Sequence, residues 1–340
     1  MDCHQIIITS QPEATVIALN ETQKIDAGAR GRRLSPEAQL VETPKGYLAL
    51  LAELPSTIFI RHVFPVHAVY PAADDNLYRQ LITLCKDIPK NEALSIQMRE
   101  ASLGPICAES KAMLQALERD MLSQGYIFDN KNPMWALSLY LHENNLYAGV
   151  SSCSNNFSSW NGGIHRLKKS EQFVSRAEFK LEEAIASFGI ETAMRSMKTK
   201  KAIDLGAAPG GWTKILLQHS YHVTAVDPGA LSDAIAGTPN LVHFKDVAQK
   251  FRSQTNSYDL LVNDMRMDMV ESCEIMLNMA HFLTPDGIAL MTLKLPHSQW
   301  YKHTKRAISI LQKKYVLLKA RQLFHNRSEV MVYCKINEIH

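Results

Sequence analysis

Beyond residue 200 the sequence alternates short apolar runs with amphipathic stretches, and this alternation constrains the fold more than any other feature. Five apolar runs are typical of buried strands, namely residues 202–205, 223–226, 258–262, 288–293 and 329–334. Strands interleaved with helices form a doubly wound, mostly parallel sheet with helices on both faces. We therefore expect an α/β, Rossmann-like domain over about residues 170–340.

Polar residues stand at the ends of these runs. Asp227 follows the second run, Asp264 the third and Lys294 the fourth. In a doubly wound sheet, ligands bind outside the carboxyl ends of the strands. These side chains should therefore converge on one crevice.

A glycine-rich segment, Asp-Leu-Gly-Ala-Ala-Pro-Gly-Gly-Trp-Thr at 204–213, closes the first run. Glycine lets the backbone adopt positive φ and approach a ligand closely, and the N-terminus of the next helix favours a carboxylate. The segment lacks the G-x-G-x-x-G pattern of dinucleotide loops and the lysine of nucleotide-triphosphate loops. We expect a different cofactor, bound by Asp204, Gly206, Pro209, Gly210, Gly211 and Trp212.

Three further carboxylates are candidates for this cofactor site. Asp227 is placed to accept both ribose hydroxyls of an adenosyl cofactor, and Asp264 lies beside the same crevice. Asp246 stands where it could recognise an adenine amino group, or it could simply cap a helix.

Four residues are candidates for catalysis: Lys180, Asp264, Lys294 and Glu329. Any one of them could be half of a salt bridge at the rim of the sheet. Four such residues reaching one rim by accident is a much weaker explanation.

The segments 175–181, 204–213, 263–265 and 293–296 resemble those of the FtsJ-type ribose 2′-O-methyltransferases. That family carries a Lys-Asp-Lys-Glu tetrad, which the resemblance assigns to Lys180, Asp264, Lys294 and Glu329. It also implies S-adenosyl-L-methionine as cofactor and an RNA ribose as the methyl acceptor.

A closer resemblance, over residues 147–340, is to the RlmM-type cytidine 2′-O-methyltransferases of 23S rRNA. It rests on the segments 154–156, 166–168, 180–184 and 320–325. The resemblance implies a ferredoxin-like region at 1–65, a THUMP-like RNA-binding domain at 66–160 and a methyltransferase domain at 170–340. The N-terminal half shows few motif identities with that family.

The chemistry of the tetrad follows from its residue types. A ribose hydroxyl must lose its proton as it attacks a sulfonium methyl group, and neutral Lys294 could accept that proton. A free lysine has a pKa near 10.4, so Lys294 would need desolvation and a second cation, Lys180, to lower its pKa. Asp264 could orient Lys294, and Glu329 could position Lys180 or the hydroxyl.

The N-terminal half predicts a small α+β region. Strands are expected at 6–9, 47–54, 57–63 and 93–99, helices at 14–19 and 108–124, and a hairpin at 135–141 and 146–150. The Ser/Asn/Gly-rich stretch 151–163 is typical of a linker. An enzyme domain with no RNA role remains the alternative for this half.

A basic run leads into the catalytic domain, with His165, Arg166, Lys168, Lys169, Arg176 and Lys180. It is typical either of a solvated surface or of a segment that follows RNA phosphates. The net charge of the chain, only +3, does not distinguish the two.

The six cysteines form no C-x-x-C pair and no histidine cluster has zinc spacing, so we expect reduced thiols and no metal. We see no signal peptide and no run long enough to span a membrane, which predicts a cytoplasmic protein. The rival functions are a methyltransferase for a non-RNA substrate, a catalytically inactive RNA-binding protein and, least favoured, a nicotinamide oxidoreductase.

Overall fold

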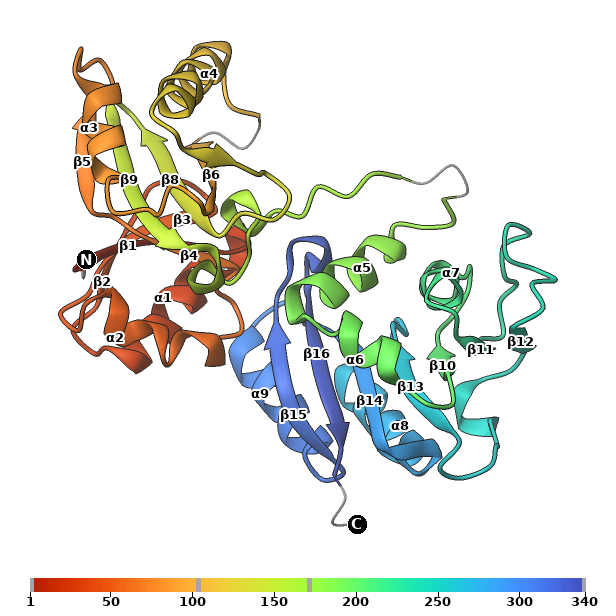
Figure 1. Cartoon of the computed structure of the whole chain (residues 1–340). Helices are drawn as coiled ribbons and strands as arrows, with labels where there is room; N and C mark the ends of the chain where they lie inside the picture. Colours follow the sequence, from red (N-terminus) through yellow and green to blue (C-terminus); the bar gives the residue numbers. More distant parts are fainter. Residues whose placement is uncertain (1–2, 102–104, 170–172, 338–340) are drawn as a thin grey trace. The chain divides into compact units, whose positions relative to one another are not determined.

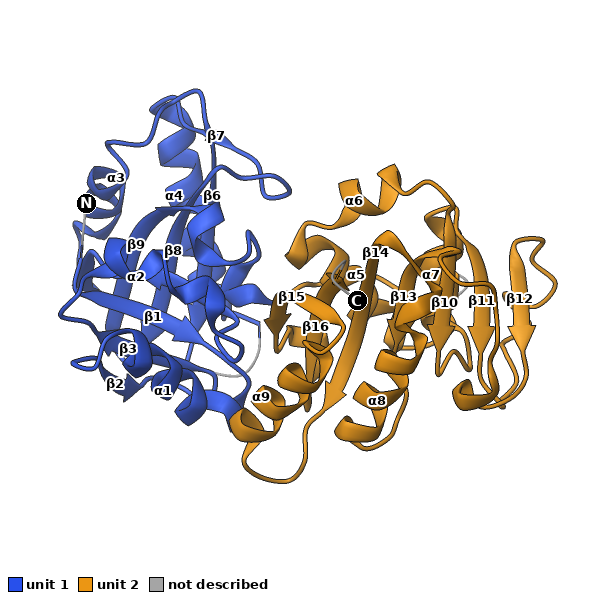
Figure 2. Ribbon diagram, turned by 90° about the horizontal axis from the view of Figure 1, so that it is seen from below, with its two compact units in different colours: residues 1–164 blue, residues 165–340 orange. Residues whose placement is uncertain are grey.

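The computed structural model of the chain describes residues 3–101, 105–169 and 173–337. It divides into two compact units, Met1–Ile164 and His165–His340 (Figures 1 and 2). Each unit has hydrophobic cores of its own, and each is described separately.

The first sheet of unit 1 is antiparallel, with strand order β2-β3-β1-β4. Along the chain its elements follow a β-α-β-β-α-β succession, which is ferredoxin-like. The elements are β1 (Gln5–Thr9), α1 (Thr15–Ile25), β2 (Arg30–Arg33), β3 (Ala38–Glu42), α2 (Tyr47–Leu51) and β4 (His62–Pro65).

The prediction of a strand at 47–54 is wrong, because this segment forms α2 and a following 3₁₀ turn, Leu54–Ser56. Its buried residues, Tyr47, Leu50 and Leu54, recur at the i, i+3, i+7 spacing of a helix. The segment is apolar nearly throughout, so neighbouring elements rather than its own pattern select the helix.

The second sheet of unit 1 is mixed, with strand order β5-β9-β8-β6-β7. It packs against α3 (Leu77–Leu84) and α4 (Ala108–Ser123). Its strands are β5 (Ala68–Pro71), β6 (Ala93–Glu100), β7 (Ile127–Phe128), β8 (Trp135–His142) and β9 (Asn145–Ser152).

The two sheets of unit 1 share a small core. Ile7 and Phe64 from the first sheet are buried in one cluster with Tyr140 and Tyr147 from the second. The sequence-based boundary near residue 65 therefore falls between two sheets that pack together inside one compact unit.

The stretch 151–163 is not a free linker, contrary to expectation. It forms two 3₁₀ turns, Cys153–Asn156 and Asn161–Gly163, which bind back to the sheets of unit 1. Thr9 donates its hydroxyl to the Gly162 carbonyl at 3.1 Å, and Asn161 donates to the Met98 carbonyl at 2.6 Å. Small residues are used here for close packing.

Unit 2 contains the expected doubly wound sheet, with strand order β12-β11-β10-β13-β14-β16-β15. All its strand pairs are parallel except those of β16, which runs antiparallel to β14 and β15. The strands are β10 (Lys201–Leu205), β11 (His222–Val226), β12 (Leu241–Phe244), β13 (Tyr258–Asn263), β14 (Leu283–Lys294), β15 (Tyr315–Arg321) and β16 (Glu329–Ile336).

Helices cover both faces of this sheet, and the α/β fold predicted from the sequence is confirmed. Figure 2 shows α5, α6 and α7 on one face and α8 and α9 on the other. Their bounds are α5 (Ala177–Phe188), α6 (Glu191–Ser196), α7 (Gly211–Gln218), α8 (Met269–Met279) and α9 (Trp300–Leu311). Among the described helices, none combines the length and apolar character needed to cross a membrane.

The strand order reverses between β10 and β13, since the chain turns outward in one direction from β10 and in the other from β13. At such a switch point the connections leave a crevice beyond the carboxyl ends of the strands. The glycine-rich segment follows β10 and Asp264 follows β13, so both lie at this crevice.

Candidate active site

Strand register brings two of the four tetrad residues together. In the antiparallel β14–β16 pair, Lys294 lies directly opposite Glu329. Thr292, two residues before Lys294, points to the same face because side chains alternate along a strand. Asp264 begins the loop after β13, and Lys180 reaches the site from α5.

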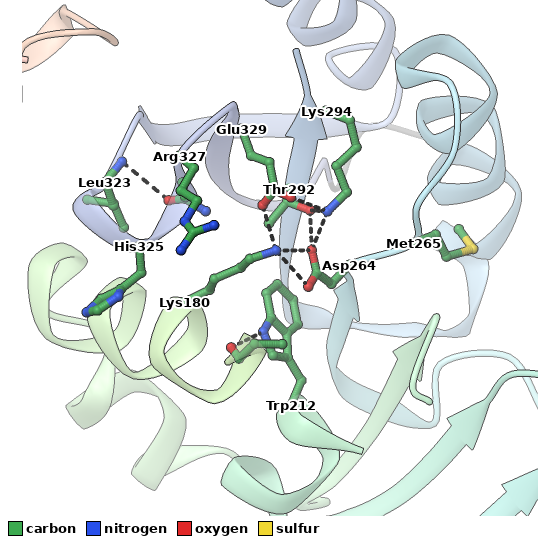
Figure 3. A network of polar contacts seen from close by, with 12 residues as sticks. Lys180, Trp212, Asp264, Met265, Thr292, Lys294, Leu323, His325, Arg327 and Glu329 are labelled. Carbon is green, nitrogen blue, oxygen red and sulfur yellow. Dashed lines mark hydrogen bonds and ion pairs between the residues drawn. The ribbon is translucent and has the colours of Figure 1, made fainter. Parts of the chain in front are cut away.

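The four side chains form a closed network of charges (Figure 3). Lys294 Nζ lies 2.6 Å from Asp264 Oδ1 and 2.8 Å from Glu329 Oε1. Lys180 Nζ lies 3.1 Å from Asp264 Oδ2 and 2.7 Å from Glu329 Oε2. Each ammonium contacts both carboxylates, so the structure brings together all four residues predicted for catalysis.

The network is partly buried, since its side chains are between 13% and 20% exposed. Burial disfavours the charged form of Lys180, but Asp264 and Glu329 outweigh it and raise the pKa of Lys180. Burial likewise opposes ionisation of Asp264, but Lys294 and Lys180 prevail and lower its pKa. The carboxylates therefore hold Lys180 in its charged form.

The glycine-rich segment has the predicted backbone conformation. Gly206 has φ 74° and Gly210 has φ 111°, a region that L side chains rarely adopt. A Cβ on Gly210 would lie 2.1 Å from the Ile235 side chain, and one on Gly206 would lie 2.7 Å from the Met265 side chain. The protein's own packing already requires glycine at both positions.

Three other residues of this segment have structural contacts. Trp212 is 2% exposed and donates its indole N–H to the Ala177 carbonyl at 2.8 Å, which fixes the first turn of α5. The Pro209 carbonyl accepts from the Ser232 N–H, and Gly211 packs against Ser175. Their direct contact with a cofactor stays a prediction.

Asp204, Asp227 and Asp264 stand at the carboxyl ends of three adjacent strands. Asp204 is 1% exposed and accepts from the Thr213 hydroxyl at 2.6 Å, while its other oxygen, Oδ1, has no hydrogen-bond partner among the described residues. Burial, together with the charges of Asp264 and Asp227, raises the pKa of Asp204 to about 7. The crevice is therefore acidic and suits a cationic ligand.

Asp227 keeps room for further hydrogen bonds. Its Oδ2 accepts from the Ala208 N–H at 3.1 Å and its Oδ1 from the Gly229 N–H at 2.6 Å. A carboxylate offers about four lone-pair sites, so these two contacts leave capacity for ligand hydroxyls.

Asp246 makes local contacts but does not cap a helix, because the 3₁₀ turn that follows, Ala248–Lys250, has Val247 at its N-cap and no side-chain cap hydrogen bond. It accepts from the N–H of the next residue, Val247, at 2.8 Å and pairs with Lys250 at 3.1 Å, at the start of a 3₁₀ turn. Its recognition of an adenine stays a prediction.

Sequence reasoning missed three residues that build the site. Thr292 donates to Asp264 Oδ1 at 2.6 Å and accepts from Lys294 Nζ at 2.8 Å. Glu178 forms a buried ion pair with Lys214 at 3.0 Å, joining α5 to α7. The two-residue spacing of Thr292 and Lys294 on a strand could have revealed the role of Thr292. Nothing in the local sequence reveals the ion pair of Glu178 and Lys214.

Among the described residues, no group of three or more His, Cys, Asp or Glu side chains has the arrangement of a metal site.

Residues 173–318 match the family of FtsJ-like methyltransferases. Similar curated proteins are called ribosomal RNA large subunit methyltransferase M. The one from Psychromonas ingrahamii is 30% identical over 219 residues, which are 61% of this chain and 59% of that protein. The one from Halorhodospira halophila is 35% identical over 178 residues, covering 52% and 51%.

A longer alignment includes the N-terminal half. The protein of that name from Shewanella sp. MR-4 is 27% identical over 302 residues, which are 84% of this chain and 82% of that protein. The aligned part thus ranges from about half to four-fifths of these relatives' own length.

Proposed function

We propose that the protein transfers a methyl group from S-adenosyl-L-methionine to a ribose 2′-oxygen of RNA, since residues 173–318 match the FtsJ-like methyltransferase family. The observation that carries the proposal is the network of Lys180, Asp264, Lys294 and Glu329 at the switch point of the sheet. The named relatives favour large-subunit ribosomal RNA as the substrate, and the earlier resemblance favours a cytidine of 23S rRNA. Ribosome assembly would place the protein in the cytoplasm.

The acidic crevice fits the cofactor's charge. Asp227 would accept the ribose hydroxyls of the cofactor. Asp204 lies at the start of the glycine-rich segment, and its Oδ1, which lacks a partner among the described residues, would stabilise the cofactor's positive charge. When bound, the cofactor supplies an electrophilic methyl group on a positively charged sulfur.

Each tetrad residue would then have a separate role in activating the 2′-hydroxyl. Lys294 accepts the 2′-hydroxyl proton, while Asp264 and Thr292 hold its amine in place. Lys294 must be neutral to act as this base, so one proton has to leave the network before the hydroxyl attacks. Lys180 stabilises the negative charge that develops on the oxygen. General-base action of this kind contributes about 10²–10⁴-fold.

The N-terminal half would hold the RNA. We propose a ferredoxin-like region at 1–65 and a THUMP-like domain at 66–160 in front of the methyltransferase domain at 170–340. An inactive RNA-binding protein would have no need to keep four charged side chains in mutual contact.

The test is methyl transfer to deproteinised 23S rRNA prepared from cells that lack the gene. A 2′-O-methyl group blocks attack by the 2′-oxygen on the adjacent phosphodiester, so the product should resist alkaline hydrolysis at one nucleotide. A methyl group on a base or on protein would contradict the proposal.

A further inference from the structure

A pocket of about 870 Å³ opens beside the tetrad, all within unit 2. Among the described residues, six cationic side chains line it against two carboxylates. Those two carboxylates, Asp264 and Glu329, are already paired with Lys180 and Lys294. The remaining cations, Lys169, Arg176, Arg266 and Arg327, leave the pocket strongly positive.

Arg327 is the most constrained of these four. Its backbone has φ 48° and ψ −109°, a conformation that glycine ordinarily provides in a tight turn. Its side chain is exposed and makes no ion pair with any residue that the structure describes. Figure 3 shows Arg327 and His325 on the Lys180 side of the tetrad. An arginine in a backbone conformation that favours glycine, beside the charged tetrad, points to a role for its guanidinium.

Buried polar groups hold the loop in this conformation. Gln322, 1% exposed, donates to the Arg327 carbonyl at 2.6 Å, and the Leu295 N–H donates to the Ser328 carbonyl at 2.9 Å. Glu183, also 1% exposed, accepts from the N–H groups of Phe324 at 2.9 Å and His325 at 2.7 Å. The loop is thus anchored from three directions.

The Glu183 anchor also ties the loop to the tetrad. Glu183 and Lys180 lie three residues apart on α5, one turn of the same helix. A shift of α5 would therefore displace Lys180 and the loop together. This arrangement ties the backbone of the loop that carries Arg327 to the helix that carries Lys180.

We propose that Arg327 binds a phosphodiester of the substrate RNA next to the target ribose, and that Glu183 is the positioning residue that holds its loop. This inference rests on the proposed function and assigns the pocket to the RNA backbone. The guanidinium offers two parallel donors that match a phosphate. The two carboxylates of the pocket, Asp264 and Glu329, are already paired with Lys180 and Lys294.

The test compares Arg327→Gly, which keeps the backbone conformation without the side chain, with Arg327→Lys, which keeps the charge. The matched control is Lys305→Ala on the exposed side of α9. For Arg327→Gly we expect the KM for 23S rRNA to rise about tenfold, since hydrogen bonds to charged groups have that order of strength. The cofactor Kd should stay unchanged, and kcat should change little because ground and transition states share the contact.

Salt dependence supplies a readout that a purely structural role would not move. Loss of one phosphate contact should lower the slope of log KM against log salt by about 0.7 for single-stranded RNA. Arg327→Lys should recover most of that slope, and Lys305→Ala should match the wild type.

Glu183→Gln tests the anchor. It should raise the KM for RNA. Adding Arg327→Gly should raise the KM little further, because the effects of two substitutions that disturb the same contact do not add. An Arg327→Gly enzyme with wild-type KM and salt slope overturns the proposal while leaving ribose methylation intact. If the wild-type protein itself methylates no ribose, the proposed function has failed instead. If Glu183→Gln fails to fold, the comparison of Arg327→Gly with Arg327→Lys still tests whether Arg327 binds a phosphate.

Discussion

Single residues in this protein have their properties set by contacts from distant parts of the chain. Lys180 and Lys294 are 114 positions apart in sequence, yet each contacts both Asp264 and Glu329. With equal numbers of positive and negative groups, the network is balanced before substrate arrives. Its chemistry must therefore begin with a change in charge at the crevice.

We expect Lys294→Ala to remove most turnover while leaving cofactor affinity within a few-fold, because the amine acts on the hydroxyl in the transition state. Lys294→Arg is the sharper variant. It keeps the positive charge between Asp264 and Glu329 but cannot be deprotonated, so it should be equally inactive. Calorimetry with the cofactor and single-turnover methylation measure the two effects. Wild-type turnover by either variant would remove Lys294 from the mechanism.

Acid should destabilise unit 1 through His62, which lies in β4 and is 1% exposed. Burial, with the charges of Arg99 and Arg61, lowers its pKa to about 3. Below pH 6.5 the unfolded chain gains a proton that the folded chain does not, so stability falls as pH decreases. At pH 4.5 the loss should approach about 3 kcal/mol, from about 1.4 kcal/mol for each pH step.

The comparison that checks this is the drop in Tm between pH 7.5 and 4.5. His62→Gln does not titrate and should show a smaller drop than the wild type. His222→Gln, at an exposed position in β11, is the control and should behave like the wild type. Equal drops for His62→Gln and wild type would refute the prediction.

At the scale of elements, helix α5 organises the catalytic edge of unit 2. It carries Glu178, Lys180 and Glu183 within its first two turns. Through these residues it contacts α7, the tetrad and the loop after Leu323. The sequence marked only Lys180, through the family resemblance. The partners of Glu178 and Glu183 lie 36 and 141 residues away, and the local sequence does not reveal them.

The approach of β9 to β4 in unit 1 depends on a glycine. A Cβ on Gly149 would lie 1.7 Å from the Pro65 carbonyl oxygen, and a backbone atom cannot move aside cheaply. We expect Gly149→Ala to destabilise unit 1 by about 1–3 kcal/mol, the usual effect of overpacking. Thermal unfolding measures it, with Ser152→Ala on the same strand as the control. A Tm equal to that of the wild type would show that the sheets can separate without strain.

At the scale of the whole molecule, the chain consists of two compact units that meet in sequence at Ile164 and His165. The FtsJ-like match lies entirely within the second. That unit has its own core, formed by residues of α5, α6, α7 and five strands. The proposed chemistry and the proposed RNA affinity are therefore assigned to separable parts.

A fragment that begins at His165 should bind the cofactor like the full chain but methylate RNA poorly, because it lacks the proposed RNA-binding half. A fragment that begins at Ser170 would lose a hydrogen bond within unit 2, since the His165 carbonyl accepts from His325 Nε2 at 2.8 Å. Cofactor Kd, RNA methylation rate and their salt dependence should be compared with those of the full chain. A fragment as active on RNA as the full chain would give the N-terminal half another role.

The sequence by itself determined the architecture of unit 2. Each buried strand between amphipathic helices is visible in the sequence as a short apolar run. The residue at the end of each run marks the edge of the sheet where ligands bind. The edge strands β12 and β15 were missed because strands flanked on one side only lack a continuous apolar run. All four tetrad residues were named from their positions and from the family resemblance.

The tertiary structure decided everything that depends on contacts between distant segments. The antiparallel register of β16 sets Glu329 opposite Lys294, and the docking of α5 brings Lys180 to Asp264. Packing made residues 47–51 a helix and bound 151–163 to the sheets of unit 1. Side-chain periodicity is a local property that a sequence displays directly. Register, burial and the pKa of Lys180 arise from neighbours far along the chain, so they exist only once the chain has folded.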